Sequence, residues 1–174
     1  MFTAKDIQDQ NQGNGNSNYT NITEQKLNPG DCKMNLSMEL KGSQVNQNEE
    51  ENVAVIGEGK EIIEIDDTED LKNVSRITIK DGVKEIGECA FSDLDNLKEI
   101  NLPGSIKKIG ERAFIGCENL EKVELKDGIN EISEFAFNSC KRLTRISIPG
   151  SVEKIGKYTF VNCESLEEVE LKDG

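Results

Sequence analysis

The 174-residue sequence has no histidine and no tryptophan, and only 5% of its residues are aromatic. Histidine is the commonest general base and a very common metal ligand. Its absence removes the Ser-His-Asp and Cys-His arrangements of nucleophilic catalysis, and no glycine-rich phosphate loop follows a candidate strand. The sequence therefore predicts a protein that is not an enzyme, with no catalytic residues, no cofactor and no bound metal.

Basic residues are also scarce, because 21 Lys and Arg residues stand against 34 Asp and Glu residues, giving a formal net charge of −13. A nucleic-acid-binding protein needs a basic stripe, and acidic membrane surfaces repel such a chain. No run of 18 apolar residues is present, and the N-terminus lacks the pattern of a secretory signal. The chain as it stands therefore predicts an acidic cytoplasmic protein that binds no nucleic acid and does not insert into a membrane.

The five cysteines are odd in number and show no CxxC spacing, which does not favour a disulfide framework or a zinc site. Cys117, Cys140 and Cys163 lie 23 residues apart, and Leu94 takes the same place one period earlier. A position that accepts Cys or Leu is typical of an apolar core, so we expect three buried, inert thiols. Cys89 falls at a different position of the period, where we expect more exposure.

A 23-residue repeat dominates the rest of the chain. Four full copies cover residues 77–99, 100–122, 123–145 and 146–168, and residues 169–174 begin a fifth. Each copy combines a short alternating strand, a Pro-Gly or Asp-Gly turn, a second extended piece and an Ala-Phe or Thr-Phe segment with helical spacing. One such repeat cannot bury its own apolar face, so the period predicts a solenoid of stacked coils. Its core columns would include Phe91, Phe114, Phe137 and Phe160.

The chain before the full copies divides into two parts. Sixteen of the first 52 residues are Asn or Gln, and this composition predicts a disordered tail over residues 1–52. Residues 53–76 look like a degenerate copy, because Asp70-Leu-Lys-Asn-Val-Ser-Arg-Ile77 echoes the segment from Asp93 to Ile100. Terminal repeats are usually atypical, so we expect an N-terminal capping repeat there, followed by the solenoid over residues 77–174.

The pattern Leu-x-x-Ile-x-Leu-Pro-x-x-Ile-x-x-Ile-Gly-x-x-Ala-Phe-x-x-Cys-x-x-Leu over residues 97–120 resembles the BspA-like class of leucine-rich repeats. The resemblance implies an α/β solenoid, a right-handed curved array with a parallel β-sheet on its concave side and short helical turns on the other. It also implies surface proteins of host-associated bacteria and some protists that adhere to host proteins or other cells. On that basis a cell-surface or secreted location is expected if the chain is a fragment.

The outward positions of the concave strands are the expected protein-binding surface, although they hold no Trp or Tyr to anchor a partner. A rival apolar surface, at Ile115, Phe135, Tyr158 and Val161, is interpreted instead as side chains that cover the joints between coils. A separate column with alternating charges, from Glu85 to Lys154, predicts a solvated ladder. The candidate protein-binding residues are Thr78, Asn101, Glu124, Ser147, Lys98, Glu121, Thr144, Lys122 and Arg145.

Two functions remain open from the sequence. The first is a non-enzymatic protein–protein interaction scaffold, a fragment of a cell-surface adhesin, whose partner would be a host extracellular-matrix or cell-surface protein. The alternative is a self-associating structural solenoid. It would stack end to end through the uncapped C-terminal end at residues 169–174, because an unpaired sheet edge invites pairing.

Overall fold

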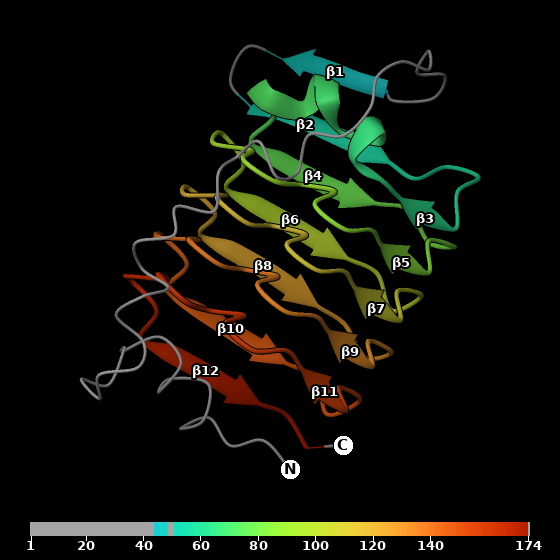
Figure 1. The fold of residues 1–174 in the computed structure, drawn as a ribbon. Coiled ribbons are helices and arrows are strands. Elements are labelled where there is room, and N and C mark those ends of the chain that lie inside the picture. Colours follow the sequence, from blue (N-terminus) through green and yellow to red (C-terminus); the bar gives the residue numbers. More distant parts are fainter. Residues whose placement is uncertain (1–43, 49–50, 174) are drawn as a thin grey trace.

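The computed structural model describes residues 44–48 and 51–173, which form a solenoid of stacked coils with two parallel sheets (Figure 1). We call one face the long-strand face, because its strands have four to six residues, and the other the short-strand face, because its strands have two residues. The long-strand face comprises β1 (Gln44–Asn48), β2 (Glu51–Ile56), β4 (Arg76–Ile79), β6 (Glu99–Leu102), β8 (Lys122–Leu125), β10 (Arg145–Ile148) and β12 (Glu168–Leu171). The short-strand face comprises β3 (Ile62–Ile63), β5 (Glu85–Ile86), β7 (Lys108–Ile109), β9 (Glu131–Ile132) and β11 (Lys154–Ile155).

Neighbouring coils are joined in a register of one 23-residue period. Ile77 of β4 lies opposite Ile100 of β6, which lies opposite Val123 of β8. On the short-strand face Ile86 lies opposite Ile109, which lies opposite Ile132. The sequence prediction of a repeat solenoid with parallel sheets is confirmed, whereas its hand and its curvature stay predictions.

The long-strand sheet is interrupted once. Its order is β1-β2-β4-β6-β8, and β10 and β12 form a separate pair, while the short-strand sheet continues from β3 to β11. Elsewhere the residue before a strand bonds across the joint, as when the Glu121 N–H donates to the Lys98 carbonyl and the Glu167 N–H to the Thr144 carbonyl. Within residues 51–173 no equivalent bond links Thr144 to Glu121. One joint of this face is therefore held without a β-ladder.

The core contains the expected column of phenylalanines. Phe91, Phe114, Phe137 and Phe160 are completely buried. Successive rings are nearly parallel, with centroids 5.1, 5.1 and 5.7 Å apart. The widest spacing, between Phe137 and Phe160, falls at the coil joint where the long-strand sheet is interrupted. Identical residues one period apart thus pack as the repeat predicts.

The segments that carry these phenylalanines, here called the Phe turns, are residues 88–93, 111–116, 134–139 and 157–162. The helical turns expected there are not confirmed, because the structure has isolated turns at these residues. Each Phe turn contains two residues with φ between 55° and 73°, four positions apart, such as Arg112 and Gly116. That backbone directs alternate N–H groups to the next coil, as when Phe114 donates to the Ala136 carbonyl at 2.8 Å. Bonds between coils replace the bonds within a helix.

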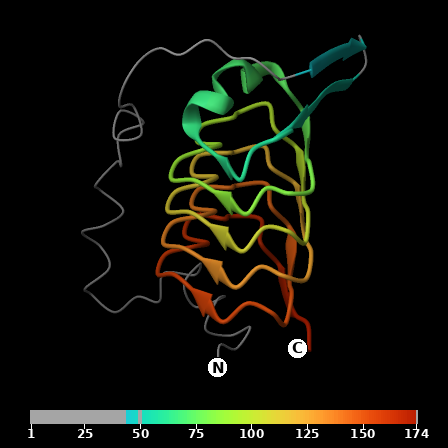
Figure 2. The same ribbon diagram turned by 90° about the vertical axis from the view of Figure 1, so that its right-hand side faces the viewer.

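The N-terminal end of the solenoid is covered by the two 3-10 helices η2 (Ile65–Asp67) and η3 (Glu69–Asn73), which lie over the first coil (Figure 2). Thr68 stands between them, one period before Phe91. It is buried, and its hydroxyl donates to the Ala90 carbonyl. In later coils a backbone N–H serves the equivalent carbonyl, so Thr68 replaces that donor where the repeat begins. This contact is what a capping segment requires.

The predicted tail over residues 1–52 meets the structure only at its last residues. β1 lies within that range and pairs antiparallel with β2, which itself begins at Glu51. The expected boundary between residues 52 and 53 therefore falls inside β2. Residues 1–43 lie outside the described residues, and the prediction for them stays a prediction.

Three of the cysteines form a buried column, as expected. Cys117, Cys140 and Cys163 are free and buried, and their thiols donate to the carbonyls of Phe91, Phe114 and Phe137. Burial raises the pKa of Cys117 and of Cys163 to about 12, and it raises the pKa of Cys140 well above its usual value. The expectation for Cys89 is wrong, since that residue is only 5% exposed and is disulfide-bonded.

Candidate protein-binding face

The nine predicted binding residues all lie on one surface, along or just before the strands of the long-strand face. Thr78, Asn101 and Glu124 form one row, since β4, β6 and β8 pair in register at these positions. Each points outward because its strand alternates with buried residues such as Ile77 and Ile100. Ser147 takes the same place in β10, beyond the interruption. Lys98, Glu121 and Thr144 precede the strands and are exposed, as are Lys122 and Arg145.

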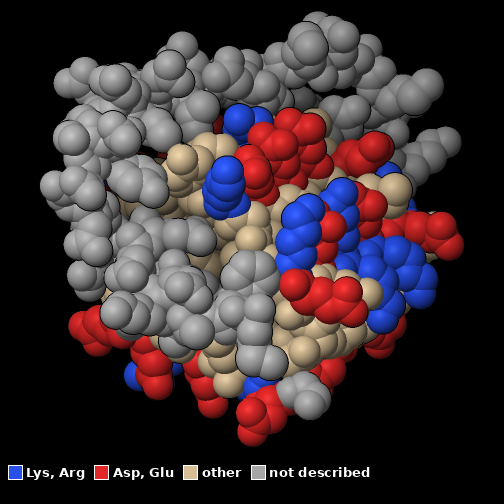
Figure 3. Space-filling model, turned by 60° about the horizontal axis from the view of Figure 1, so that its bottom comes forward, with Lys and Arg blue, Asp and Glu red and all other residues tan. Residues whose placement is uncertain are grey.

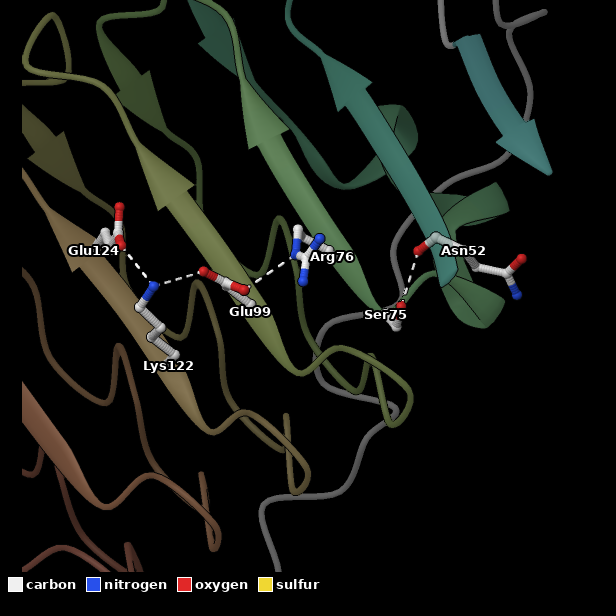
Figure 4. A network of polar contacts seen from close by, with 6 residues as sticks. All are labelled: Asn52, Ser75, Arg76, Glu99, Lys122 and Glu124. Atoms are coloured by element: carbon white, nitrogen blue, oxygen red, sulfur yellow. Dashed lines mark hydrogen bonds and ion pairs between the residues drawn. The ribbon is translucent and has the colours of Figure 1, made fainter. Parts of the chain in front are cut away.

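Charged side chains cross from strand to strand on this face (Figure 4). The Nε of Arg76 donates to Oε2 of Glu99 at 3.0 Å, and the Nζ of Lys122 donates to Oε1 of the same carboxylate at 2.8 Å. Lys122 also pairs with Glu124 in its own strand, at 2.6 Å. The network fixes the orientation of four side chains over three strands.

These contacts shift the proton affinities of the groups involved. The hydrogen bond from Lys122 lowers the pKa of Glu99 despite the opposing effect of partial burial. The hydrogen bonds to Glu124 and to Glu99 raise the pKa of Lys122. Both groups are therefore charged near neutral pH, and the face has fixed charges rather than a group poised to exchange a proton.

Like charges meet at the interruption of this face. Lys122 begins β8 and Arg145 begins β10, one period later, so two cations follow each other where the rest of the column alternates as Arg76, Glu99 and Lys122. Lys122 forms ion pairs with Glu99 and with Glu124 of its own strand. Arg145 has no ion pair within the described part of the chain. The face therefore presents one guanidinium that is exposed and not neutralised by a neighbour. Lys122 and Arg145 are both among the predicted binding residues, but the prediction did not include the repulsion between them.

Charges of both signs continue over the rest of the solenoid. The column predicted on the short-strand face is confirmed as a ladder, with Lys108 paired to Glu85 at 3.5 Å and Lys154 paired to Glu131 at 3.0 Å. In Figure 3, which brings the C-terminal end forward, basic and acidic side chains lie next to one another, and neither sign occupies the visible face alone. A partner must therefore match a pattern of charges rather than a single field.

A second column with outward positions lies on the Phe turns. The rings of Phe135 and Tyr158 stack with centroids 5.1 Å apart, and the Arg112 guanidinium lies 5.4 Å from the centroid of the Phe135 ring. Arg112 is also paired with Glu111 at 2.5 Å. All three column members are half-buried. These side chains cover the joints between coils, as the interpretation of Phe135 and Tyr158 stated, and the position of Arg112 adds a cation to the stack.

The described coils contain no candidate metal site and no candidate membrane-spanning helix. Among residues 44–48 and 51–173 no cluster of three or more His, Cys, Asp or Glu residues is placed to hold a metal ion. The helices described there are all too short to cross a bilayer. What the long-strand face offers chemically is a rigid array of hydrogen-bonding and charged groups at spacings set by the coils.

A family model for the BspA type leucine-rich repeat region matches residues 68–174 in six copies. A solved leucine-rich repeat protein from Bacteroides capillosus is 26% identical, with a TM-score of 0.54, over 78% of this chain and 97% of that one. The leucine-rich repeat protein of T. pallidum is 24% identical, with a TM-score of 0.49, over 73% of this chain and 67% of that one.

A leucine-rich cell surface protein from Faecalibacterium prausnitzii is 29% identical, with a TM-score of 0.44. That match covers 57% of this chain and 32% of the other, so this chain corresponds to about a third of the larger protein. No curated protein matches the chain.

Proposed function

The chain belongs to the BspA-type leucine-rich repeat family, and from that premise we propose that it is a non-enzymatic scaffold that binds a partner protein through its long-strand face. Solenoids of this kind use an extended array of outward residues rather than a cleft. Because each coil contributes a few polar contacts, the affinity depends on several coils acting together.

One observation carries the proposal. The 23-residue register holds Thr78, Asn101 and Glu124 in a single row, with a charged network beside it that includes Glu99 and Lys122. A framework held by buried columns fixes the backbone that carries these groups, so that less conformational freedom is lost on binding. The exposed Arg145 supplies the kind of side chain that is enriched at interface hot spots.

We further propose that the partner is an extracellular protein and that the chain acts in adhesion at a cell surface. The resemblance of residues 97–120 to surface proteins supports this location. The disulfide at Cys89 supports it independently, because disulfides persist in oxidising compartments such as the cell exterior.

The proposal is tested with immobilised fibronectin and fibrinogen as probes of the extracellular matrix, measured by surface plasmon resonance. The variant Asn101→Arg places a long cation in the outward row, and Asn130→Arg places the same side chain on the exposed short-strand side as a matched control. Binding that weakens about tenfold in Asn101→Arg alone supports the long-strand face. Equal weakening in both variants contradicts that face, and no binding to either probe contradicts matrix adhesion.

The alternative function, end-to-end self-association, is favoured by one observation. β12 pairs with β10 on one side, and the described residues place no strand on its other side. Light scattering between about 1 and 100 µM separates the two functions, because a stacking solenoid grows in mass with concentration and a monomeric scaffold does not.

A further inference from the structure

A column of asparagines precedes the strands of the long-strand face, and one of its members differs from the others. Asn73, Asn96 and Asn119 lie 23 residues apart. The amide nitrogen of Asn96 donates to the Lys72 carbonyl at 2.8 Å, and that of Asn119 donates to the Asp95 carbonyl at 2.7 Å. The side chain of Asn73 is exposed and makes no hydrogen bond among the described residues. The amide nitrogen of Asn73 is therefore available for a reaction.

The residues that follow Asn73 also set it apart. A hydroxyl group stands two places after Asn73, in Ser75, whereas Lys98 and Glu121 take that place after Asn96 and Asn119. Asn73-Val-Ser75 is thus an Asn-x-Ser/Thr triplet without proline, the pattern that accepts an N-linked oligosaccharide. Within residues 51–173 no other asparagine begins such a triplet. The sequence and the free amide single out the same residue.

The backbone around Asn73 is fixed without its side chain. Asn73 is the last residue of η3, which lies over the first coil (Figure 2). Its carbonyl accepts a hydrogen bond from Nδ2 of Asn52 at 2.8 Å. Val74 is buried, and its N–H donates to the Leu71 carbonyl at 2.9 Å. A large group attached to the exposed Asn73 amide therefore displaces no packed side chain of the cap.

A related triplet at Asn138 lacks these properties. Asn138-Ser-Cys140 has a thiol in place of the hydroxyl. Asn138 is only 6% exposed, and Cys140 is completely buried. A glycan at Asn138 would require its Phe turn to open, so this position serves as an internal control.

The contacts of Ser75 indicate when Asn73 could be modified. The Ser75 hydroxyl donates to the Asn52 carbonyl at 3.1 Å (Figure 4), and the Ser75 N–H donates to the same oxygen at 2.8 Å. An enzyme that recognises the hydroxyl can reach it only before β2 pairs with β4. Modification therefore precedes closure of the first joint, and the folded cap then keeps the modified Asn73 in solvent.

We propose that Asn73 is an acceptor site for an N-linked oligosaccharide. The proposal rests on the extracellular location proposed above, because the transfer acts on chains that enter an export route. Nδ2 of Asn73 loses a proton to a base of the transferring enzyme and forms a bond to the anomeric carbon of the sugar. The bond from that carbon to the diphosphate of a lipid-linked oligosaccharide breaks, and the lipid diphosphate leaves with the electron pair.

The test translates the full 174-residue chain behind a cleavable export signal with rough microsomes, which supply the transferase and the lipid-linked donor. Protection from added protease identifies the translocated chains. Peptide N-glycosidase then converts each modified Asn to Asp, and peptide mass mapping reads Asn73 separately from the three triplets within residues 1–43. Ser75→Ala removes the hydroxyl, Ser75→Thr retains it, and Asn96→Gln changes the matched position of the next coil.

We expect most translocated chains to be modified at Asn73 and none at Asn138. Occupancy of Asn73 should fall at least about tenfold in Ser75→Ala and stay unchanged in Ser75→Thr and Asn96→Gln. Translocated chains with an unmodified Asn73, or equal occupancy in Ser75→Ala, overturn the proposal. Because occupancy is read without a matrix protein, this failure is distinct from a failure of matrix binding.

A second measurement examines whether the folded cap accommodates the glycan. Once the membranes are dissolved, modified and unmodified chains should be cleaved by a protease at equal rates, because the exposed Asn73 side chain takes no part in packing. Faster cleavage of the modified chains would overturn the assignment of the site to the folded cap.

Discussion

Lys122 and Arg145 carry the same charge one period apart, and the long-strand sheet is interrupted between the strands that they begin. Elsewhere in this column opposite charges follow each other, and the ladder is continuous from β4 to β8. Like charges opposite one another on neighbouring strands are destabilising. The repulsion therefore falls on the joint that has the fewest backbone bonds to resist it.

Restoring the alternation should stabilise that joint. The double variant Arg145→Glu/Glu168→Lys gives the column the order Arg, Glu, Lys, Glu, Lys, and we expect it to raise the melting temperature by about 1–4 °C at low salt. The single variant Glu168→Lys places three cations in succession and should lower it. Thermal unfolding followed by circular dichroism measures both, and a gain that survives at 1 M salt would show that charge is not the cause.

The phenylalanine column should carry a large part of the stability. Phe114 lies between Phe91 and Phe137, each 5.1 Å away, and Phe114→Ala leaves a cavity with ring partners on both sides. We expect a loss of about 3–5 kcal/mol in the free energy of unfolding, measured by urea titration. Phe135→Ala is the control, since that ring is half-buried on the outside of the Phe turn and should cost less. Equal losses of unfolding free energy in Phe114→Ala and Phe135→Ala would contradict the expectation that the buried column matters more than the outer ring.

The core could be predicted from the sequence because it depends on identity at a fixed spacing. Residues such as Phe114 and Phe137, or Ile86 and Ile109, recur every 23 positions, and a stacked coil is the arrangement that brings each residue to its own equivalent. The outward residues followed from the same register with the alternation of strands. The family resemblance and the repeat therefore agree on the fold.

The Phe turns could not be predicted in detail. Ala113, Phe114 and Cys117 have helical spacing, and the sequence of one coil alone favours a helical turn. Bonds to the next coil decide the outcome, because Arg112 adopts φ 55° and Phe114 donates to Ala136. The succession of Lys122 and Arg145 was visible in the sequence, whereas the interruption of the sheet between β8 and β10 was not.

The hydroxyl group of Thr68 should contribute more to the stability of the protein than the volume of its side chain. Thr68→Val keeps the shape and leaves the buried Ala90 carbonyl without that donor, so we expect a loss of about 1–3 kcal/mol in unfolding free energy. Thr68→Ser retains the hydroxyl and should recover most of the loss. If Thr68→Val and Thr68→Ser lower the free energy of unfolding equally, packing rather than hydrogen bonding explains the contribution of Thr68.

The disulfide at Cys89 predicts how many thiols react with a labelling reagent before and after reduction. Five cysteines with one disulfide leave three free thiols, all of them buried. A thiol reagent at pH 8 should label almost none in the native protein, three after denaturation and five after denaturation with reductant. Five thiols without reductant would show that Cys89 is reduced and would remove its support for an extracellular location.

The three buried thiols also predict how stability depends on pH. Their folded-state pKa values lie above the unfolded value near 9, at about 12 for Cys117 and Cys163, because burial disfavours the thiolate. The unfolded chain therefore releases these protons first, and stability is lost as pH rises from about 9 toward 12. Each thiol contributes up to about 1.4 kcal/mol per pH unit over that window. Urea titrations at pH 8, 9, 10 and 11 measure the slope, and Cys163→Ala isolates the contribution of one thiol. A slope that is the same in the variant would mean that the Cys163 thiol ionises as easily in the folded protein as in the unfolded chain.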